Sequence, residues 1–449
     1  MSLMTKAREM AEKTPPQRNR YVDYLRALSI GVVVLGHWLM AIFTVEEGQV
    51  VAQHMLKEAP WTQILTWFFQ VMPVFFMVGG YSNAASWSAT ERDGKSYTDW
   101  LRSRCQRLLG PTVVFSLVWI PIALFARNVI EDPNVLIAAG HLVAVPLWFM
   151  AVYLMTVPLA PLMFRLHRRF GLTVPLILTV IAAAADILDP TINVKGEPLK
   201  VSWSWINFAV VWLAVHQIGY FWQEGRLERK AATKFVLFLG GLAGMILLTA
   251  SDYYGFSMIG VPGSPQSNNA PPTAVLIFLA AFQMGAILIT TPWANRRLAR
   301  TEPWARTIVA NGMIMTIYLW HITAMVIAVW IVYSLGWTFP MDPLSWQWWL
   351  SRIGWIAILA PFLAVLLGLF NRFERPAPAS PVGPGLGKAV IACIGALAAA
   401  FGLAGLAIKG ICSPGDFWGV PTGAILLLFV GSVMVGVTPA IYKKKKKES

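Results

Sequence analysis

Charged side chains are scarce in this chain. Asp, Glu, Lys and Arg make up 13% of its 449 residues, whereas hydrophobic residues make up 57%. Together with a mean hydropathy of +0.59, this scarcity excludes a soluble globular domain and indicates a polytopic membrane protein. Carboxylates are the scarcer charge, because 22 acidic residues stand against 36 basic ones. Cysteines number only three, and their spacing indicates neither a disulfide framework nor a metal site.

Long apolar runs fill most of the sequence. About twelve have the composition of membrane spans, and they lie near 25–45, 61–88, 108–128, 141–164, 172–188, 202–222, 235–250, 272–290, 307–334, 347–370, 389–409 and 419–442. Most of the 36 Lys and Arg residues fall on one side when the N-terminus is placed in the cytoplasm. The positive-inside rule then predicts two cytoplasmic termini and an external, irregular connection at 251–271. The net charge of +14 therefore indicates orientation, and no nucleic-acid partner is expected.

These patterns predict an all-α polytopic fold of five parts. The parts are a cytoplasmic basic N-terminus at 1–24, a ten-span core at 25–370, a Pro/Gly cytoplasmic linker at 371–388, a two-span hairpin at 389–442 and a polybasic cytoplasmic tail at 443–449. The N-terminus lacks the layout of a secretory signal, since it is polar and basic up to the first apolar run. The hairpin is mostly Gly, Ala, Leu, Ile and Val, so we expect it to carry no chemistry. The tail caps the last span and can contact anionic membrane lipids.

Arg26 and His37 are the most informative pair, because they lie eleven residues apart at the start of the first apolar run. Eleven helical steps return to within roughly 20° of the same face and rise about 16 Å. Asp23 lies on the same stripe. Ionisable residues inside a membrane mark function by default, and a histidine, with its ordinary pKa of about 6.5, suits a general base. A purely structural hydrogen bond is an equal alternative for His37.

His321 is a second candidate base. It lies at a similar depth within 307–334, so the two histidines could line one cavity. The remaining four have simpler interpretations: outer loops for His54 and His141, a basic inner loop for His167, and a hydrogen bond between helices for His216.

Arg104 and Arg107 lie three residues apart on the inner side, just before the third apolar run, and would share a helical face. Two guanidinium groups at the inner membrane surface can bind phosphate bidentately. The alternative is that they only extend to the lipid surface and set the topology. Asp186 is the one carboxylate placed inside a span, unless it is a helix-end residue.

Five short elements together resemble the acyltransferase-3 family of integral membrane acyltransferases, and they occur in the family order over roughly residues 20–370. They are Arg26 and His37 in DYLRALSIGVVVLGH, FFMVGGY at 75–81, Arg104 and Arg107 followed by Pro111, PLWFM at 146–150, and YLWH at 318–321. The two spans after residue 388 depart from the ten-span core of the family.

The resemblance implies acyl transfer from cytoplasmic acyl-CoA, usually acetyl-CoA, to a hydroxyl of an extracytoplasmic carbohydrate or glycolipid. It implies catalytic roles for His37, Arg26 and His321, donor binding by Arg104, Arg107 and Arg26, no metal, and a bacterial plasma membrane. Some members carry an extracytoplasmic hydrolase-like domain that this sequence lacks, so a separate extracytoplasmic partner protein is an open expectation.

Two other interpretations fit the same residues. A proton-coupled transporter or flippase of a lipid or glycan could use His37 and His321 as a relay, although few carboxylates lie within the apolar runs. A catalytically inert scaffold would leave the two buried histidines without a role.

Overall fold

The structure, a computed structural model, describes residues 2–46, 49–130, 132–188, 191–194, 197–200, 202–251, 253–264, 266–336, 345–374 and 381–437. Within this part of the chain, nine helices are long and apolar enough to cross a membrane, and two shorter apolar helices accompany them. The all-α polytopic fold is confirmed. The described strands form only two short antiparallel hairpins, β1 (Ala41–Glu46) with β2 (Gln49–His54) and β3 (Thr191–Val194) with β4 (Glu197–Lys200). The predicted polybasic tail lies outside the described residues.

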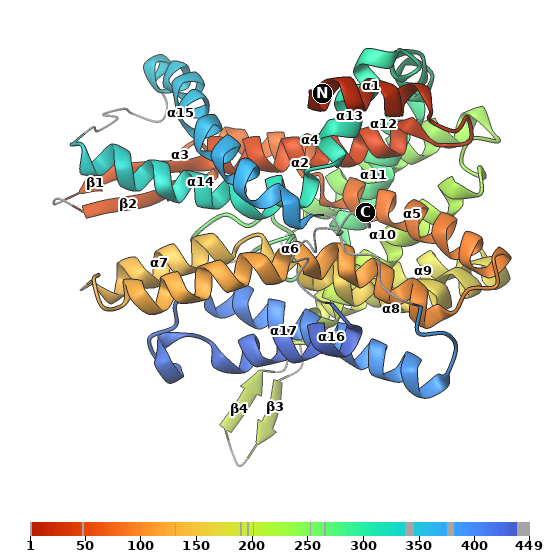
Figure 1. Ribbon diagram of the computed structural model, residues 1–449. Helices are drawn as coiled ribbons and strands as arrows, with labels where there is room; N and C mark the ends of the chain where they lie inside the picture. Colours follow the sequence, from red (N-terminus) through yellow and green to blue (C-terminus); the bar gives the residue numbers. More distant parts are fainter. Residues whose placement is uncertain are drawn as a thin grey trace, which may run out of the picture. The chain divides into compact units, whose positions relative to one another are not determined.

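The chain folds into two compact units, whose elements are labelled in Figure 1. Unit 1 comprises Met1–Ser86, Leu159–Gly312 and Trp337–Trp355, and unit 2 comprises Trp87–Pro158, Met313–Gly336 and Ile356–Ser449. Unit 1 holds α1 (Leu3–Glu12), α2 (Arg20–Met40), α3 (Met55–Glu58), α4 (Thr66–Phe69), α9 (Thr173–Ile187), α10 (Asn207–Gln223), α11 (Ala231–Thr249), α12 (Val275–Leu298) and α13 (Thr301–Asn311). Unit 2 holds α6 (Tyr97–Ala126), α7 (Pro133–Ala144), α14 (Ile314–Ser334), α16 (Leu386–Lys409) and α17 (Thr422–Val435). Helices α5 (Met72–Arg92), α8 (Leu147–Phe170) and α15 (Trp346–Phe370) cross the boundary between units.

A close crossing of α5 and α10 forms the core of unit 1. A side chain at Gly80 would collide with the backbone of His216, and one at Gly219 would collide with α5 in return. Only glycine permits this approach, as in many membrane helix pairs. The amide of Asn83 then lies 3.2 Å from His216 Nε2, which confirms the hydrogen bond between helices predicted for His216.

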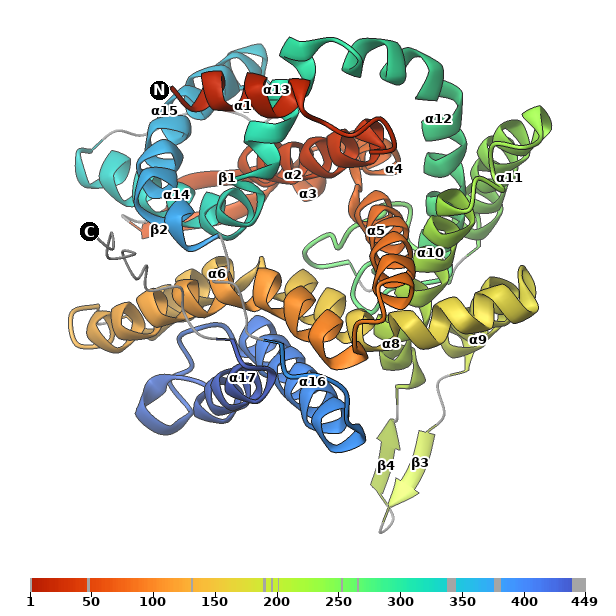
Figure 2. The same cartoon turned by 45° about the vertical axis from the view of Figure 1, so that its right-hand side comes forward.

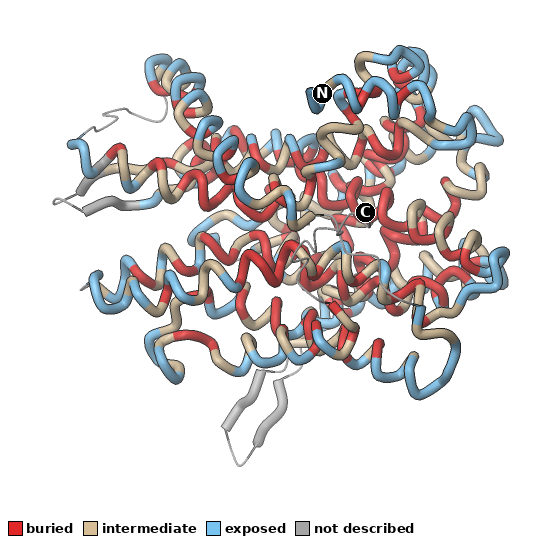
Figure 3. Tube along the Cα trace, in the orientation of Figure 1, coloured by how far each residue is buried: buried red, intermediate tan, exposed pale blue. Residues whose placement is uncertain are grey.

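Helices α11 and α12 pack side by side in unit 1, as Figure 2 shows. Gly241 makes this pairing possible, since a side chain there would meet the backbone of Phe282. The face of α11 away from α12 exposes Val236 and Leu247, whereas α10 is buried over most of its length (Figure 3). Exposed apolar stripes of this kind are typical of helices that face lipid.

The C-terminal hairpin of α16 and α17 packs tightly and is docked onto α6 within unit 2. Gly402 and Gly431 lie where a side chain would collide with the partner helix. Arg102 donates from Nε to the carbonyl oxygen of Val435 over 2.9 Å, and Gln106 donates to that of Gly436 over 3.3 Å. Both carbonyls end α17, so two polar residues of α6 cap the hairpin.

Several predicted spans have different boundaries in the structure, and three of them show the reason. The first helix runs over 20–40 rather than 25–45, because Asn19 caps its start and the strand β1 begins at Ala41. The run 141–164 divides before Leu147, since Pro146 lacks the N–H that a continuous helix needs. The run 307–334 divides between α13 and α14 at Gly312.

Candidate functional site

The start of α2 is fixed by local hydrogen bonds. The side chain of Asn19 accepts hydrogen bonds from the backbone N–H groups of Tyr21 and Val22, which satisfies two of the open donors at the helix start. Asp23 follows in the first turn, where the helix dipole favours a negative charge. The sequence therefore begins the helix five residues before its apolar run and carries a carboxylate into the protein.

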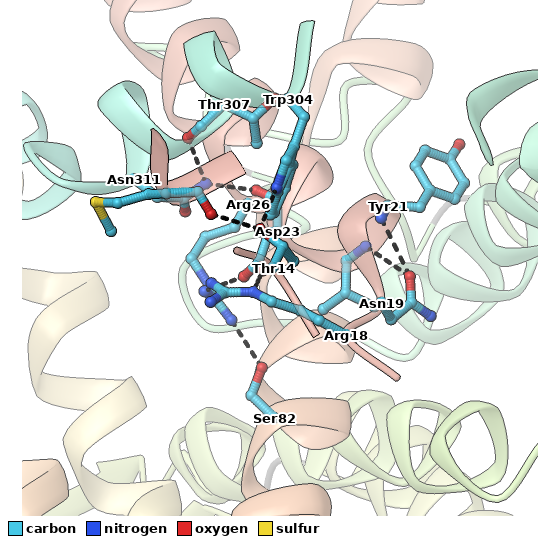
Figure 4. A network of polar contacts seen from close by, with 12 residues as sticks. Thr14, Arg18, Asn19, Tyr21, Asp23, Arg26, Ser82, Trp304, Thr307 and Asn311 are labelled. Atoms are coloured by element: carbon cyan, nitrogen blue, oxygen red, sulfur yellow. Dashed lines mark hydrogen bonds and ion pairs between the residues drawn. The ribbon is translucent and has the colours of Figure 1, made fainter. Parts of the chain in front are cut away.

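Asp23 holds two arginines, as Figure 4 shows. Arg18 Nε lies 2.7 Å from one carboxylate oxygen, and Arg26 Nη1 lies 3.1 Å from the other. Arg26 also donates from Nη2 to the hydroxyl of Ser82 on α5 over 2.7 Å. The guanidinium of Arg26 is thereby oriented by two helices, and one carboxylate is shared between two positive charges.

Helix α13 braces this cluster from its other side. The amide of Asn311 donates to the backbone carbonyl of Asp23 over 2.8 Å. Trp304 donates from its indole N–H to the hydroxyl of Thr14 over 2.8 Å, and the guanidinium of Arg18 lies 5.6 Å from the Trp304 ring centroid. The α1–α2 connection is thus tied to α13 at both ends (Figure 4).

His37 lies in the last turn of α2, on the same unbroken helix as Arg26. The predicted alignment of the two residues, about 16 Å apart along the axis, is therefore confirmed. The side chain is half-buried, and the backbone carbonyl of His37 accepts a hydrogen bond from Ala41, which ends the helix. His37 is placed near the C-terminal end of this helix rather than at its middle.

The sequence predicted that His54 lies in or beside an outer loop, but it did not show that His54 lies near His37. In the β1–β2 hairpin Ala41 pairs with His54, so His54 lies beside the turn that holds His37, and the two imidazoles interact electrostatically. His54 Nδ1 accepts a hydrogen bond from the N–H of Leu56 over 3.3 Å, and burial lowers the pKa of His54. The pairing of β1 with β2 brings His54 next to α2, and this pairing cannot be recognised from the hydropathy of the sequence.

Arg104 and Arg107 lie in the first half of α6, which starts at Tyr97 with Ser96 as its cap. They are on one continuous helix, so the predicted shared face is confirmed. Arg107 is exposed and Arg104 is half-buried. Arg102, which contacts the hairpin, points about 160° away from Arg104 around the helix. The two arginines therefore lie on the side of α6 opposite its structural contact.

His321 is fully buried on α14 in unit 2. Its Nδ1 lies 2.6 Å from the carbonyl oxygen of Tyr318. A carbonyl oxygen only accepts, so Nδ1 carries the proton and Nε2 is the basic nitrogen of the neutral ring. The Tyr318 hydroxyl donates to the carbonyl of Pro146 over 2.9 Å, which brings the YLWH and PLWFM elements together.

Glu374 is a further residue that sequence reasoning missed. Its carboxylate accepts hydrogen bonds from the backbone N–H groups of Met315 and Thr316 and from the Thr316 hydroxyl, over 3.0, 3.2 and 2.7 Å. Burial raises the pKa of Glu374. A carboxylate at a helix start is stabilised by the open N–H donors, and Glu374 thereby fixes the start of the helix that carries His321.

Asp186, near the end of α9, is held entirely by structural partners. It accepts hydrogen bonds from the amide of Asn207, the hydroxyl of Tyr254 and the backbone N–H of Ala274, over 2.8, 3.1 and 2.9 Å. These partners belong to α10, the connection after α11 and the start of α12. Asp186 therefore anchors one end of unit 1, in agreement with the helix-end interpretation.

The fold is that of a polytopic membrane protein. Its long helices carry arginines and histidines in the order in which the sequence elements described above occur. The sequence profile of the acyltransferase domain matches residues 19–371. The chain belongs to the acyltransferase-3 family. No curated protein and no solved structure matches it.

Proposed function

We propose that this membrane acyltransferase moves an acyl group, acetyl in the first instance, from cytoplasmic acyl-CoA to a hydroxyl of an extracytoplasmic glycan or glycolipid. The observation that carries the proposal is the unbroken helix α2, which joins Arg26 and His37 in a chain of an acyltransferase family. Transfer inside the membrane avoids moving a highly charged donor across the bilayer. The setting is a bacterial plasma membrane with both termini in the cytoplasm.

The chemistry assigned to His37 is general base catalysis. A ring nitrogen of His37 removes the proton of the acceptor hydroxyl, and the oxygen attacks the thioester carbonyl carbon. The carbon–oxygen bond forms as the carbon–sulfur bond breaks, and the imidazolium returns its proton to the leaving thiolate. The products are the acyl ester and free CoA thiol, and no metal enters the scheme.

Arg26 is assigned to the donor side of this scheme. Because Asp23 is shared between Arg26 and Arg18, the group of three carries one net positive charge that can attract a donor phosphate. Arg104 and Arg107 are assigned to phosphate groups of the donor as well. His321 is the alternative general base if His37 does not serve. The proposal also includes an extracytoplasmic partner protein that presents the acceptor.

The test compares envelope glycans and lipids from cells with and without the gene by mass spectrometry. We expect one class of glycan or glycolipid to lose an ester-linked acetyl group when the gene is absent. Purified protein should also turn over acetyl-CoA when that acceptor is added. An acceptor that changes sides of the membrane without acyl-CoA turnover would contradict the proposal and identify a flippase.

A further inference from the structure

A cleft of about 500 Å³ opens in unit 1 beside the Arg26 cluster. Its walls come from the α1–α2 connection, α5, α10, the segment after α10, and α12, and include Arg18, Arg20, Tyr81, Trp222, Glu228 and Asn295. A volume of this size suits a small organic ligand, since binding pockets run from roughly 300 to 1,000 Å³. Apart from Tyr81, none of these residues belongs to the family elements found in the sequence.

One wall of the cleft is aromatic. The rings of Tyr81 and Trp222 meet edge to face with their centroids 5.2 Å apart. The indole N–H of Trp222 donates to the carboxylate of Glu228 over 3.1 Å, which fixes the orientation of the ring. Trp222 is only 3% exposed, so it supports Tyr81 from behind. The half-buried ring of Tyr81 is the face on which a flat, conjugated ligand can stack at little cost in conformational entropy.

The opposite wall is cationic. Arg18 shares Asp23 with Arg26, so this group keeps an excess positive charge. Arg20 donates to the backbone carbonyl of Leu298 over 2.8 Å, and its guanidinium lies 5.4 Å from the Trp304 ring centroid. Within the described part of the chain no carboxylate forms an ion pair with Arg20. Two arginines held at a cleft wall by other contacts are arranged for an anion with several oxygens.

An aromatic wall, a cationic wall and the amide of Asn295 match a phosphorylated purine nucleotide. We infer that this cleft binds the adenine nucleotide end of the acyl-CoA donor, with the base against Tyr81 and one phosphate group toward Arg18 and Arg20. This inference rests on the proposed function. It places the nucleotide on unit 1, next to the helix that carries Arg26 and His37.

The length of the donor agrees with this placement. The arm between the nucleotide and the thioester has the backbone length of four to five extended residues, roughly 16 Å. The distance along α2 from Arg26 to His37 is also about 16 Å. Tyr81 in the cleft precedes Ser82, the hydrogen-bond partner of Arg26, so a nucleotide in the cleft starts the arm at the level of Arg26.

The test uses a substitution whose larger side chain fills the cleft. Ligand binding is then measured by calorimetry on the full-length protein in detergent. The probes are acetyl-CoA and adenosine 3′,5′-bisphosphate, which carries the base and two phosphates without the arm. Asn295 is exposed at the rim, so Asn295→Trp adds bulk to the cleft without disturbing a core. Arg296→Trp, one residue further along α12 and outside the lining, is the matched control.

We expect Asn295→Trp to weaken binding of both probes at least tenfold, and Arg296→Trp to leave both within about twofold of wild type. Pyrophosphate should compete poorly with acetyl-CoA, since it lacks the base. If wild-type protein binds acetyl-CoA and Asn295→Trp binds it equally well, the nucleotide lies elsewhere, while the acyltransferase proposal stands. If wild-type protein binds neither probe, the proposed function itself fails.

Discussion

His37 is the residue on which the proposed chemistry depends most. We expect His37→Gln to reduce acyl transfer by about 10² to 10⁴, the usual cost of losing a general base. Membrane insertion should change little, because glutamine is polar and of similar size, and the position lies in the last, half-buried turn of α2. The measurement is the rate of acyl transfer in membranes, divided by the amount of inserted protein.

His54 and His321 provide the comparison variants for this experiment. His54→Asn should reduce the rate less than His37→Gln, because His54 acts beside His37 rather than on the acceptor in the proposed scheme. Near-normal transfer by the His37→Gln protein would move the base elsewhere. His321 is then the first alternative, since its hydrogen bond to Tyr318 leaves Nε2 as the basic nitrogen.

The roles assigned to Arg104 and Arg107 lead to a prediction about the affinity for the donor. We expect the double change Arg104→Ala/Arg107→Ala to weaken acetyl-CoA binding about tenfold or more, since each charge-assisted hydrogen bond to phosphate contributes roughly 1.5–3 kcal/mol. Lysine at both positions should restore only part of the affinity, because an ammonium lacks the bidentate fork. Calorimetry across a range of salt concentrations measures both effects.

Arg92→Ala serves as the control for general electrostatic attraction, because Arg92 is exposed at the end of α5. Equal losses in Arg92→Ala and in the double variant would show that the α6 arginines contribute only to the overall surface charge.

At the scale of elements, α1 is attached to α13 by a contact that depends on pH. Ala7 and Ala11 pack against Trp304, and Arg8 Nε lies 3.0 Å from the carboxylate of Glu302. The hydrogen bond and charge of Arg8 lower the pKa of Glu302. A lowered pKa in the folded state means that the contact stabilises docking above the ordinary carboxyl pKa of about 4.3 and that this contribution is lost on acidification.

We therefore expect a spin label at the exposed Met10 position to become more mobile as the pH falls below about 4. In Glu302→Gln protein the label should be more mobile at neutral pH and respond less to acid. An unchanged acid response in that variant would assign the effect to other carboxylates.

Hydropathy predicted which parts of the chain are helical, but local polar contacts decided where the helices end. The run at 307–334 looks continuous because Gly312 interrupts neither its apolar character nor its length. The proximity of His54 to His37 was not predictable for a related reason, since the pairing of β1 with β2 depends on contacts distant from the apolar pattern. Arg104 and Arg107 were predictable because two residues three apart share a face in any helix.

The C-terminal hairpin shows the same limit of prediction from hydropathy. Its composition predicted two apolar helices, and the structure has both of them. Their attachment to α6 through Arg102 and Gln106 could not be predicted, because a side chain that caps the end of a distant helix has no periodic signature.

At the scale of the whole molecule, the charge distribution predicts that the connection after α11 lies outside the cell. Ser264 is exposed in this connection. In a Cys412→Ser background, we expect Ser264→Cys to react with a membrane-impermeant maleimide in intact cells. Ser103→Cys, exposed on α6, should react only after permeabilisation. The reverse pattern would invert the topology and remove the cytoplasmic location of the donor site.

The two units are interleaved along the chain, and this has a consequence for biosynthesis. Unit 1 is complete only when Trp355 has been made, although its first segment ends at Ser86. Domains that are continuous in sequence can fold from the N-terminus as they leave the ribosome, but neither unit has this option. Early helices must therefore persist in the bilayer as separate segments until their partners arrive, and a ribosome that stops after Gly312 leaves both units unfinished.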